Sequence, residues 1–557
     1  MTGQESPEEQ SPEEPSAQER PAGRRGTGRR RFLGLAGGAA AGVGLTACGT
    51  GTGSANRALA AAASSGAGSP SGSASGAGSS AAPSPQREND KPGNPDWRIG
   101  NAGPDQAIEG WADRSSVLPG ESFGLHVSTT APGFKVSAYR MGWYGGARGR
   151  LVWQSDQLPG AKQSAAALDP HTRMISTDWS KSTTVDTTGW PEGSYLLRLD
   201  AANGAGQRYV PVTVRSAVTA GKLVVVNAVA TWQAYNTWGG YNLYNGENGA
   251  YATRSLVVSC DRPYHEYDGA GLFMVYETPL IALAERLGLP LAYATSTDLA
   301  GQPDLLKGAL AVLSLGHDEY WSPEQRANVT AARDAGTNLA ILGANCCFRR
   351  VRYEPSPTGP DRQVVCYKDS FQQDPGYQAD KGGKAGGLPT NDYRAAPHAD
   401  PESSMLGVIY DGYPVDAPYV VGEPGHWLFA GTGVQAGDSF AHLVGVEYDR
   451  VNTGFDTPRP IEILAHSPVV CEGRKSFSDT AFYRAPSGAG VFASGTMRWV
   501  ESLDAGGDGS SGADHAMDAR TGAMTQRVTE NLLRAFAAGP AGAAHPPQDN
   551  VAAVYGT

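Results

Sequence analysis

The strongest indication of the fold is the stretch ALAVLSLGHDEYWSPEQRANVTAAR, residues 309–333. It opens with a continuous apolar run, Ala309–Leu315, of the kind found in parallel strands that are buried on both faces. Ser322 then supplies an N-cap, Pro323 the first helical position and Gln325 the third residue after the cap, which is the arrangement of a capping box. This order predicts a buried strand followed by a helix, the repeating unit of an α/β fold.

The same alternation continues on both sides of this stretch. Further apolar runs predict buried strands at 223–229, 291–295, 338–343 and 491–497, and helical patterns occur at 280–287 and 525–537. Strands and helices in alternation predict a doubly wound α/β sheet over 218–540, with ligand sites at the carboxyl ends of its strands. The last residues, 541–557, are rich in Pro, Ala and Gly and are expected to be a disordered tail.

A different pattern precedes this domain. Between residues 97 and 217, short runs alternate apolar and polar residues with a period of two, as strands with one buried face do. These runs lie at 123–129, 135–139, 194–199 and 208–214, and Pro-Gly and Pro-Glu-Gly turn signals separate them. The spacing predicts an all-β, immunoglobulin-like sandwich over 97–217.

The N-terminal residues 1–47 have the features of an export signal. Arg29 and Arg30 open a pattern close to the twin-arginine motif, and the uncharged stretch that follows is shorter than the about 20 residues of a membrane span. Cys48 ends a lipobox-like sequence and is the expected lipidation site, the alternative being a chance cysteine beside small residues. Residues 48–96 are expected to be a flexible Gly/Ser/Ala/Pro tether. These features predict an extracytoplasmic protein, exported folded by the twin-arginine pathway and lipid-anchored to the cell membrane. Because that pathway carries folded proteins, often with a cofactor already inserted in the cytoplasm, a bound metal or cofactor is expected.

Charge and cysteine content exclude two classes of function. The 557 residues carry a net charge of -11, which offers no basic surface for nucleic acid. The six cysteines include no Cys-x-x-Cys, so a structural zinc ribbon is not expected. Cys346 and Cys347 are adjacent and form a candidate disulfide half, with Cys366 as a possible partner, whereas Cys260 and Cys471 stay unassigned.

Chemistry is expected where the strand 309–315 ends. His317, Asp318 and Glu319 follow it directly, and the alternative is a polar turn in which Asp318 or Glu319 only caps the next helix. After the first strand, the loop from Thr231 to Tyr244 holds several aromatic residues and indicates either a lined pocket or a satellite core. The sequence has no Gly-x-Ser-x-Gly or Gly-x-Cys-x-Gly, so a hydrolase of this build would need metal-activated water.

Five ordered motifs resemble the catalytic, C-terminal region of the large subunit of bacterial N,N-dimethylformamidase, over roughly residues 222–538. They are Ala234-Tyr-Asn-Thr-Trp-Gly-Gly240, Gly316-His-Asp-Glu-Tyr-Trp321, Gly343-Ala-Asn345, Gly445-Val-Glu-Tyr-Asp449 and Ser494-Gly-Thr-Met-Arg-Trp499. The resemblance implies a glutamine-amidotransferase-like α/β fold and one ferric iron, Fe(3+), held by two tyrosines and a glutamate. That enzyme also works with a small partner subunit and is not a lipoprotein.

Carried over by motif, the metal ligands would be Tyr235, Tyr276 and Glu319, with Tyr241 competing for the place of Tyr235. The resemblance also makes His317, Glu447 and Asn345 the candidate catalytic residues. Phenolate and carboxylate are hard oxygen ligands, which suit a ferric ion.

The resemblance therefore implies a ferric-iron-dependent hydrolase of C–N amide bonds that acts on a small amide or peptide-like substrate. The alternative is a non-catalytic cell-surface protein that binds a glycan or peptide, which exposed tryptophans such as Trp143 and Trp153 would favour.

Overall fold

The computed structural model describes residues 88–381, 387–506 and 515–556, which belong to one compact unit. The predicted export signal, Cys48 and the tether as far as residue 87 lie outside the described residues. Residues 88–96, which the sequence assigns to the tether, instead pack on the folded chain. Glu88 is 1% exposed and accepts a hydrogen bond from the hydroxyl of Tyr144 at 3.0 Å. The described fold therefore begins earlier than predicted.

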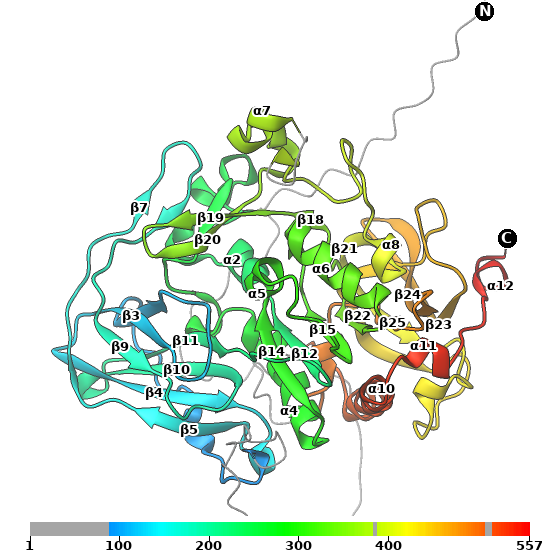
Figure 1. The fold of residues 1–557 in the computed structure, drawn as a ribbon, viewed down its shortest axis with the longest axis horizontal. Helices are drawn as coiled ribbons and strands as arrows, with labels where there is room; N and C mark the ends of the chain where they lie inside the picture. Colours follow the sequence, from blue (N-terminus) through cyan, green and yellow to red (C-terminus); the bar gives the residue numbers. More distant parts are fainter. Residues whose placement is uncertain (1–87, 382–386, 507–514, 557) are drawn as a thin grey trace, which may run out of the picture. The chain divides into compact units, whose positions relative to one another are not determined.

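A seven-stranded mixed sheet forms the centre of the α/β part, in the order β14-β12-β15-β17-β25-β24-β23. The first five strands pair in parallel and the last two add antiparallel, and β14, β12 and β15 lie side by side in Figure 1. Their bounds are β12 Leu223–Asn227, β14 Leu291–Thr295, β15 Ala311–Gly316, β17 Asn338–Gly343, β23 Ile461–Cys471, β24 Arg474–Arg484 and β25 Gly490–Ala493. The predicted α/β class is confirmed.

Helices connect the parallel strands, as the sequence predicts. The described α-helices include α2 Val229–Tyr235, α3 Phe273–Tyr276, α4 Thr278–Arg286, α5 Ser296–Gly301, α6 Pro323–Asp334, α7 Pro375–Asp380, α8 Ser403–Leu406, α9 Trp499–Ser502 and α10 Ala519–Ala537. Helix α6 begins as predicted, because the Ser322 side chain accepts a hydrogen bond from the Gln325 backbone N–H at 3.2 Å. The cap of α6 is thus Ser322, and the alternative that Asp318 or Glu319 caps this helix is wrong.

The preceding part of the chain folds as two sheets around one core. One sheet has the order β1-β3-β9 and the other β2-β11-β10-β4-β5, with β6 paired to β4. Their bounds are β1 Ile108–Ala112, β2 Ser116–Val117, β3 Ser122–Thr129, β4 Gly133–Met141, β5 Gly149–Gln154, β6 Leu158–Pro159, β9 Thr183–Asp186, β10 Gly193–Ala201 and β11 Gln207–Val214. Inward residues of both sheets, such as Phe123, Leu125 and Leu197, share one buried cluster. All four predicted strands are present, whereas the immunoglobulin-like topology remains a prediction.

Smaller sheets complete the fold, and the sequence analysis predicts none of them. The pair β21 Ile409–Val420 and β22 Ser439–Arg450 is antiparallel. The others are β13 Val257–Ser259 with β20 Gly359–Val365 and β19 Arg352–Ser356, β16 Tyr320–Trp321 with β18 Arg349–Arg350, and β7 Ala167–Leu168 with β8 Ile175–Ser176. Strand β22 carries Glu447, one of the candidate catalytic residues.

The predicted disordered tail is corrected by the structure. Residues after 540 form α11 Ala541–Ala544 and α12 Val551–Tyr555. The Ala541 backbone N–H donates to Asn338 Oδ1 at 2.9 Å, and the Tyr555 hydroxyl donates to the Val451 carbonyl at 3.0 Å. These contacts to distant residues order the segment despite its Pro/Ala/Gly composition.

The predicted disulfide half is likewise corrected. Cys260, Cys346, Cys347, Cys366 and Cys471 are buried free thiols. Burial raises the pKa of Cys347 to about 12, so this thiol stays protonated and packs as a small apolar side chain.

Within the described ranges, no helix has the length and apolar character needed to cross a membrane.

Candidate functional site

The candidate site lies where the order of the parallel strands reverses. Strand β12 pairs with β14 on one side and with β15 on the other, and α/β sheets bind ligands at such a switch point. Helix α2 follows β12 and ends at Tyr235, while β15 ends at Gly316 and leads directly into His317 and Glu319. Gly316 has φ +55°, and a Cβ there would lie 2.4 Å from Tyr276 Cβ. Glycine therefore allows Tyr276 to pack against the end of β15.

Tyr235 and Glu319 meet, as the resemblance implies. The Tyr235 hydroxyl donates to Glu319 Oε2 at 2.6 Å, and Glu319 is 0% exposed. A third side chain, Tyr244, joins them, with its hydroxyl 2.8 Å from Glu319 Oε1 and 3.0 Å from the Tyr235 hydroxyl. The Tyr320 hydroxyl donates to that of Tyr244 at 2.8 Å. The centre of the site is thus a carboxylate ringed by phenols.

Tyr244 is the residue that sequence reasoning missed as a site residue. Its only signal in the sequence is its place in the aromatic loop, whereas the competitor considered there was Tyr241. The Tyr241 backbone carbonyl accepts a hydrogen bond from buried Arg262 at 2.8 Å, and its side chain is half-buried outside the contacts described around Glu319. The interpretation of the loop as a satellite core is supported, because Tyr244 and Ala234 belong to a buried cluster, whereas the lined pocket stays a prediction.

Positive groups surround Glu319. His317 Nε2 lies 3.5 Å from Glu319 Oε2, and Arg349 Nε donates to Oε1 at 3.3 Å. Lys368 Nζ lies 3.2 Å from the centre of the Tyr244 ring. Burial by itself raises the pKa of Glu319, but the hydrogen bond and charge of His317, with the charges of Arg349 and Lys368, hold that pKa well below its usual value. Glu319 is therefore an anion at neutral pH.

The phenols differ from Glu319 in their ionisation. Burial, and then the negative charge of Glu319, raises the pKa of Tyr235 and of Tyr320 well above the usual value. Burial also raises the pKa of Tyr276 well above that value. With the groups described here these tyrosines are neutral donors, so a multivalent cation would have to displace a proton in order to bind a phenolate.

His317 lies between two carboxylates and two tyrosine rings. Its Nδ1 is 3.6 Å from Glu447 Oε2, opposite the contact of Nε2 with Glu319. Its ring centre is 4.8 Å from that of Tyr235 and 6.1 Å from that of Tyr276. The structure therefore brings Tyr276 beside His317, whereas the hydrogen bonds described at Glu319 come from other residues. An imidazole with a carboxylate near each nitrogen is suited to moving a proton.

Two further residues complete the surroundings. Asn345 follows β17, has φ +57° and donates its backbone N–H to Asp449 Oδ1 at 2.8 Å. Its buried Oδ1 has no hydrogen-bond partner among the described residues. Asp318 accepts a hydrogen bond from the Ser314 hydroxyl at 2.9 Å, and burial raises the pKa of Asp318 to about 6. Asp318 thus points back toward its own strand.

The side chains at the site show whether the ferric ion implied by the resemblance could be held there. Among the described residues, no three His, Cys, Asp or Glu side chains come together so that they could hold a metal ion. A metal at this site would therefore need phenolate ligands. Tyr235 and Glu319 supply two hard oxygen donors in contact, and either Tyr276 or Tyr244 could supply a third. Such a set fits a hard cation such as ferric iron.

The site and the fold together define an α/β protein with a buried Tyr–Glu–His centre at the switch point of its sheet. The family model described as N,N-dimethylformamidase beta subunit-like, C-terminal, matches residues 135–514, and the chain belongs to this family. The match begins in β4, so it takes in part of the sandwich as well as the α/β sheet. No curated protein matches the chain.

Proposed function

We propose that this protein is a hydrolase of C–N amide bonds that uses one ferric iron held by Tyr235, Glu319 and a second tyrosine. Family membership supports an amide hydrolase. The observation that carries the iron site is the 2.6 Å contact between the Tyr235 hydroxyl and a buried, anionic Glu319 at the end of β15.

The chain offers two candidates for the second tyrosine. Tyr276 is the residue that corresponds by motif, and its ring lies beside His317. Tyr244 is already hydrogen-bonded to Glu319. Tyr276 remains our assignment, because Lys368 on the face of the Tyr244 ring places a positive charge where a second cation would be repelled.

A bound ferric ion would polarise an amide carbonyl and lower the pKa of a water molecule. His317, in its neutral form, would take the proton from the attacking water and then deliver it to the leaving amine. Glu447, 3.6 Å from Nδ1, orients the imidazole and stabilises its charged form. The buried Oδ1 of Asn345, which has no hydrogen-bond partner among the described residues, would accept a hydrogen bond from a substrate N–H that reached it. His317 and Glu447 would thus provide the proton transfers that amide cleavage needs, and Asn345 would bind the substrate.

The test is to measure iron and amidase activity together in the Glu319→Gln variant. The change keeps the shape of the side chain but removes its negative charge, so both iron and activity should be lost. Glu247→Gln, at an exposed position in the segment between Tyr244 and β13, is the matched control and should keep both. A Glu319→Gln protein that retains iron would contradict the ligand assignment.

The alternative is a non-catalytic surface-binding protein, for which Trp143 and Trp153 are expected to be exposed. Trp153 is half-buried, with its ring centre 6.2 Å from that of Trp190. Trp143 is also half-buried, under the guanidinium of Arg286 at 5.5 Å. Neither offers the exposed face that stacks on a glycan.

We also propose that the protein works outside the cytoplasm. The twin-arginine pattern and the lipobox-like sequence at Cys48 support export of the folded protein and its attachment to the cell membrane by a lipid. The substrate would then be a small amide or a peptide-like molecule present at the cell surface.

A further inference from the structure

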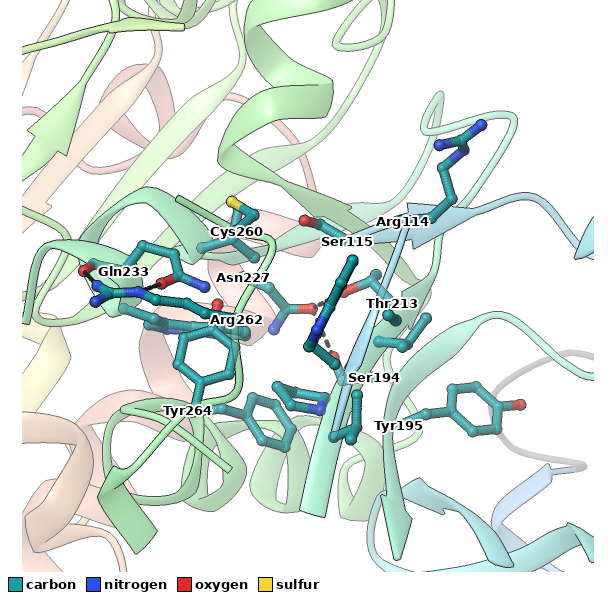
Figure 2. Close-up of a pocket in the computed structure, with 18 of the residues that line it drawn as sticks. Arg114, Ser115, Ser194, Tyr195, Thr213, Asn227, Gln233, Cys260, Arg262 and Tyr264 are labelled. Atoms are coloured by element: carbon teal, nitrogen blue, oxygen red, sulfur yellow. Dashed lines mark hydrogen bonds between the residues drawn. The ribbon is translucent and has the colours of Figure 1, made fainter. Parts of the chain in front are cut away.

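A small cavity lies where strands of the sandwich meet the α/β sheet. Its lining includes Ser194, Thr213, Asn227, Trp232 and Arg262. Figure 2 labels Ser194, Thr213, Asn227 and Arg262 among the side chains around it. The cavity leaves about 30 Å³ for the centres of water-sized molecules, which is room for more than one water. Several of the polar side chains that line it also bond to one another.

Asn227 links the cavity wall to the sandwich. It is the last residue of β12, and its Oδ1 accepts hydrogen bonds from the Ser194 hydroxyl and the Thr213 hydroxyl, each at 2.8 Å. Figure 2 draws both bonds as dashed lines. Ser194 belongs to β10 and Thr213 to β11, and all three side chains are buried. Two sandwich strands thus hold the carboxyl end of β12.

Glu277 carries the connection onward to the candidate site. The Asn227 side-chain NH₂ donates to Glu277 Oε2, while Oε1 accepts the Ala228 backbone N–H at 3.0 Å and Trp232 Nε1 at 2.9 Å. Ala228 is the N-cap of α2, and Trp232 lies within that helix, which ends at Tyr235. Glu277 itself directly follows Tyr276. The buried carboxyl group of Glu277 therefore joins both tyrosine-bearing segments.

We propose that Ser194, Thr213, Asn227 and Glu277 form a positioning relay through which the sandwich fixes the segments that carry Tyr235 and Tyr276. The naming of these tyrosines as ligands rests on the proposed function, whereas the relay is a property of the chain alone. All four residues are buried. Removing Asn227 or Glu277 leaves a buried polar group without its partner, whereas Asn227 Oδ1 loses both of its donors only when Ser194 and Thr213 are changed together. These residues act through the backbone and touch no reacting atom.

The first experiment removes the sandwich end of the relay. In the full-length chain, Ser194→Ala with Thr213→Val deletes both donors to Asn227, and hydrogen exchange of α2 amides should speed up by about tenfold. Thr187→Val is the matched control, because the buried Thr187 hydroxyl bonds only to sandwich residues in the described contacts, Leu118, Glu121 and Gly120. It should leave α2 unchanged. Unchanged exchange in the double variant would overturn the proposal.

The second experiment exchanges the chemistry of the two central residues. Glu277→Gln alone sets an NH₂ group against the NH₂ of Asn227, and Asn227→Asp alone replaces the NH₂ donor to Glu277 with a second carboxyl group. The double variant Asn227→Asp/Glu277→Gln restores a donor facing an acceptor, so α2 exchange should return to within about threefold of the unmodified chain. If α2 amides exchanged as fast in the double variant as in either single variant, the proposal would be overturned.

Iron content, measured on the same samples, separates the two proposals. A wild-type protein without iron would contradict the proposed function, while the exchange data would still decide the relay. If iron is bound, the relay variants should broaden or shift the phenolate-to-iron absorption band, and the exchanged pair should restore it.

Discussion

Loss of the Arg140 guanidinium should destabilise the contact between the sandwich and helix α4. Arg140 on β4 donates through Nη2 to Glu285 Oε1 at 2.5 Å and through Nη1 to Oε2 at 3.1 Å. The two side chains are 2% and 0% exposed, and the Tyr293 hydroxyl donates to the same carboxylate at 2.6 Å. Burial lowers the pKa of Arg140, but the charge of Glu285 outweighs burial and raises that pKa well above its usual value. The Arg140 guanidinium is therefore charged, and it contacts the Glu285 carboxyl group through two nitrogens.

The magnitude follows from the burial of this pair. Arg140→Met leaves Glu285 as a buried charge without its counter-ion, which should lower the free energy of unfolding by about 3–5 kcal/mol. Adding Glu285→Leu removes that stranded charge, so the double variant should be more stable than Arg140→Met. The comparison separates the cost of an unpaired charge from the loss of packing.

Urea unfolding followed by tryptophan fluorescence measures these differences. The matched control is Arg459→Met, which breaks the pair of Arg459 with Asp549, whose side chains are 43% and 30% exposed. That loss should be within about 1 kcal/mol, because water screens exposed pairs. If Arg140→Met also cost less than about 1 kcal/mol, our account of how the sandwich is fastened to α4 would be wrong.

Three further expectations concern proton transfer, pH and export. His317→Ala should keep more iron than amidase activity, because it removes a proton carrier and leaves Tyr235 and Glu319 in place; parallel loss of both would contradict this role. Burial raises the pKa of Asp449 to about 8, so the native state holds a proton that the unfolded state has released. From about pH 4 to pH 8 stability should therefore fall as pH rises, by up to about 1.4 kcal/mol per unit, and Asp449→Asn should flatten the slope seen in urea titrations. Cys48→Ser should abolish lipid modification and release the protein from membrane fractions, and unchanged fractionation would refute the anchor.

Much of the α/β sheet could be predicted, because each of its parallel strands has a recognisable apolar run in the local sequence. Strands β14 and β17 occupy the residues expected from their apolar runs, since strands buried on both faces need no alternation. Strand β21 was not predictable in the same way, because Pro414 and Pro418 interrupt it and proline argues against a strand interior. The packed C-terminal segment was missed because long-range bonds, such as that of Ala541 to Asn338, order it.

The candidate site was predictable in part. The meeting of Tyr235 with Glu319 follows from motif resemblance and from the rule that adjacent parallel strands present their carboxyl ends together. Tyr244 was not predictable, because its contact with Glu319 depends on how an irregular loop folds back over β15. The role of Glu277 was hidden as well, since its three partners come from the end of β12 and from α2.

The most direct test of the central claim is the iron content and visible spectrum of the full-length protein, purified folded from cells supplied with iron. Two tyrosinates and Glu319 on a ferric ion predict about one iron per chain and a phenolate-to-iron charge-transfer band. Tyr276→Phe should weaken that band and Tyr241→Phe should leave it unchanged. A colourless, iron-free protein with its fold intact would contradict the account.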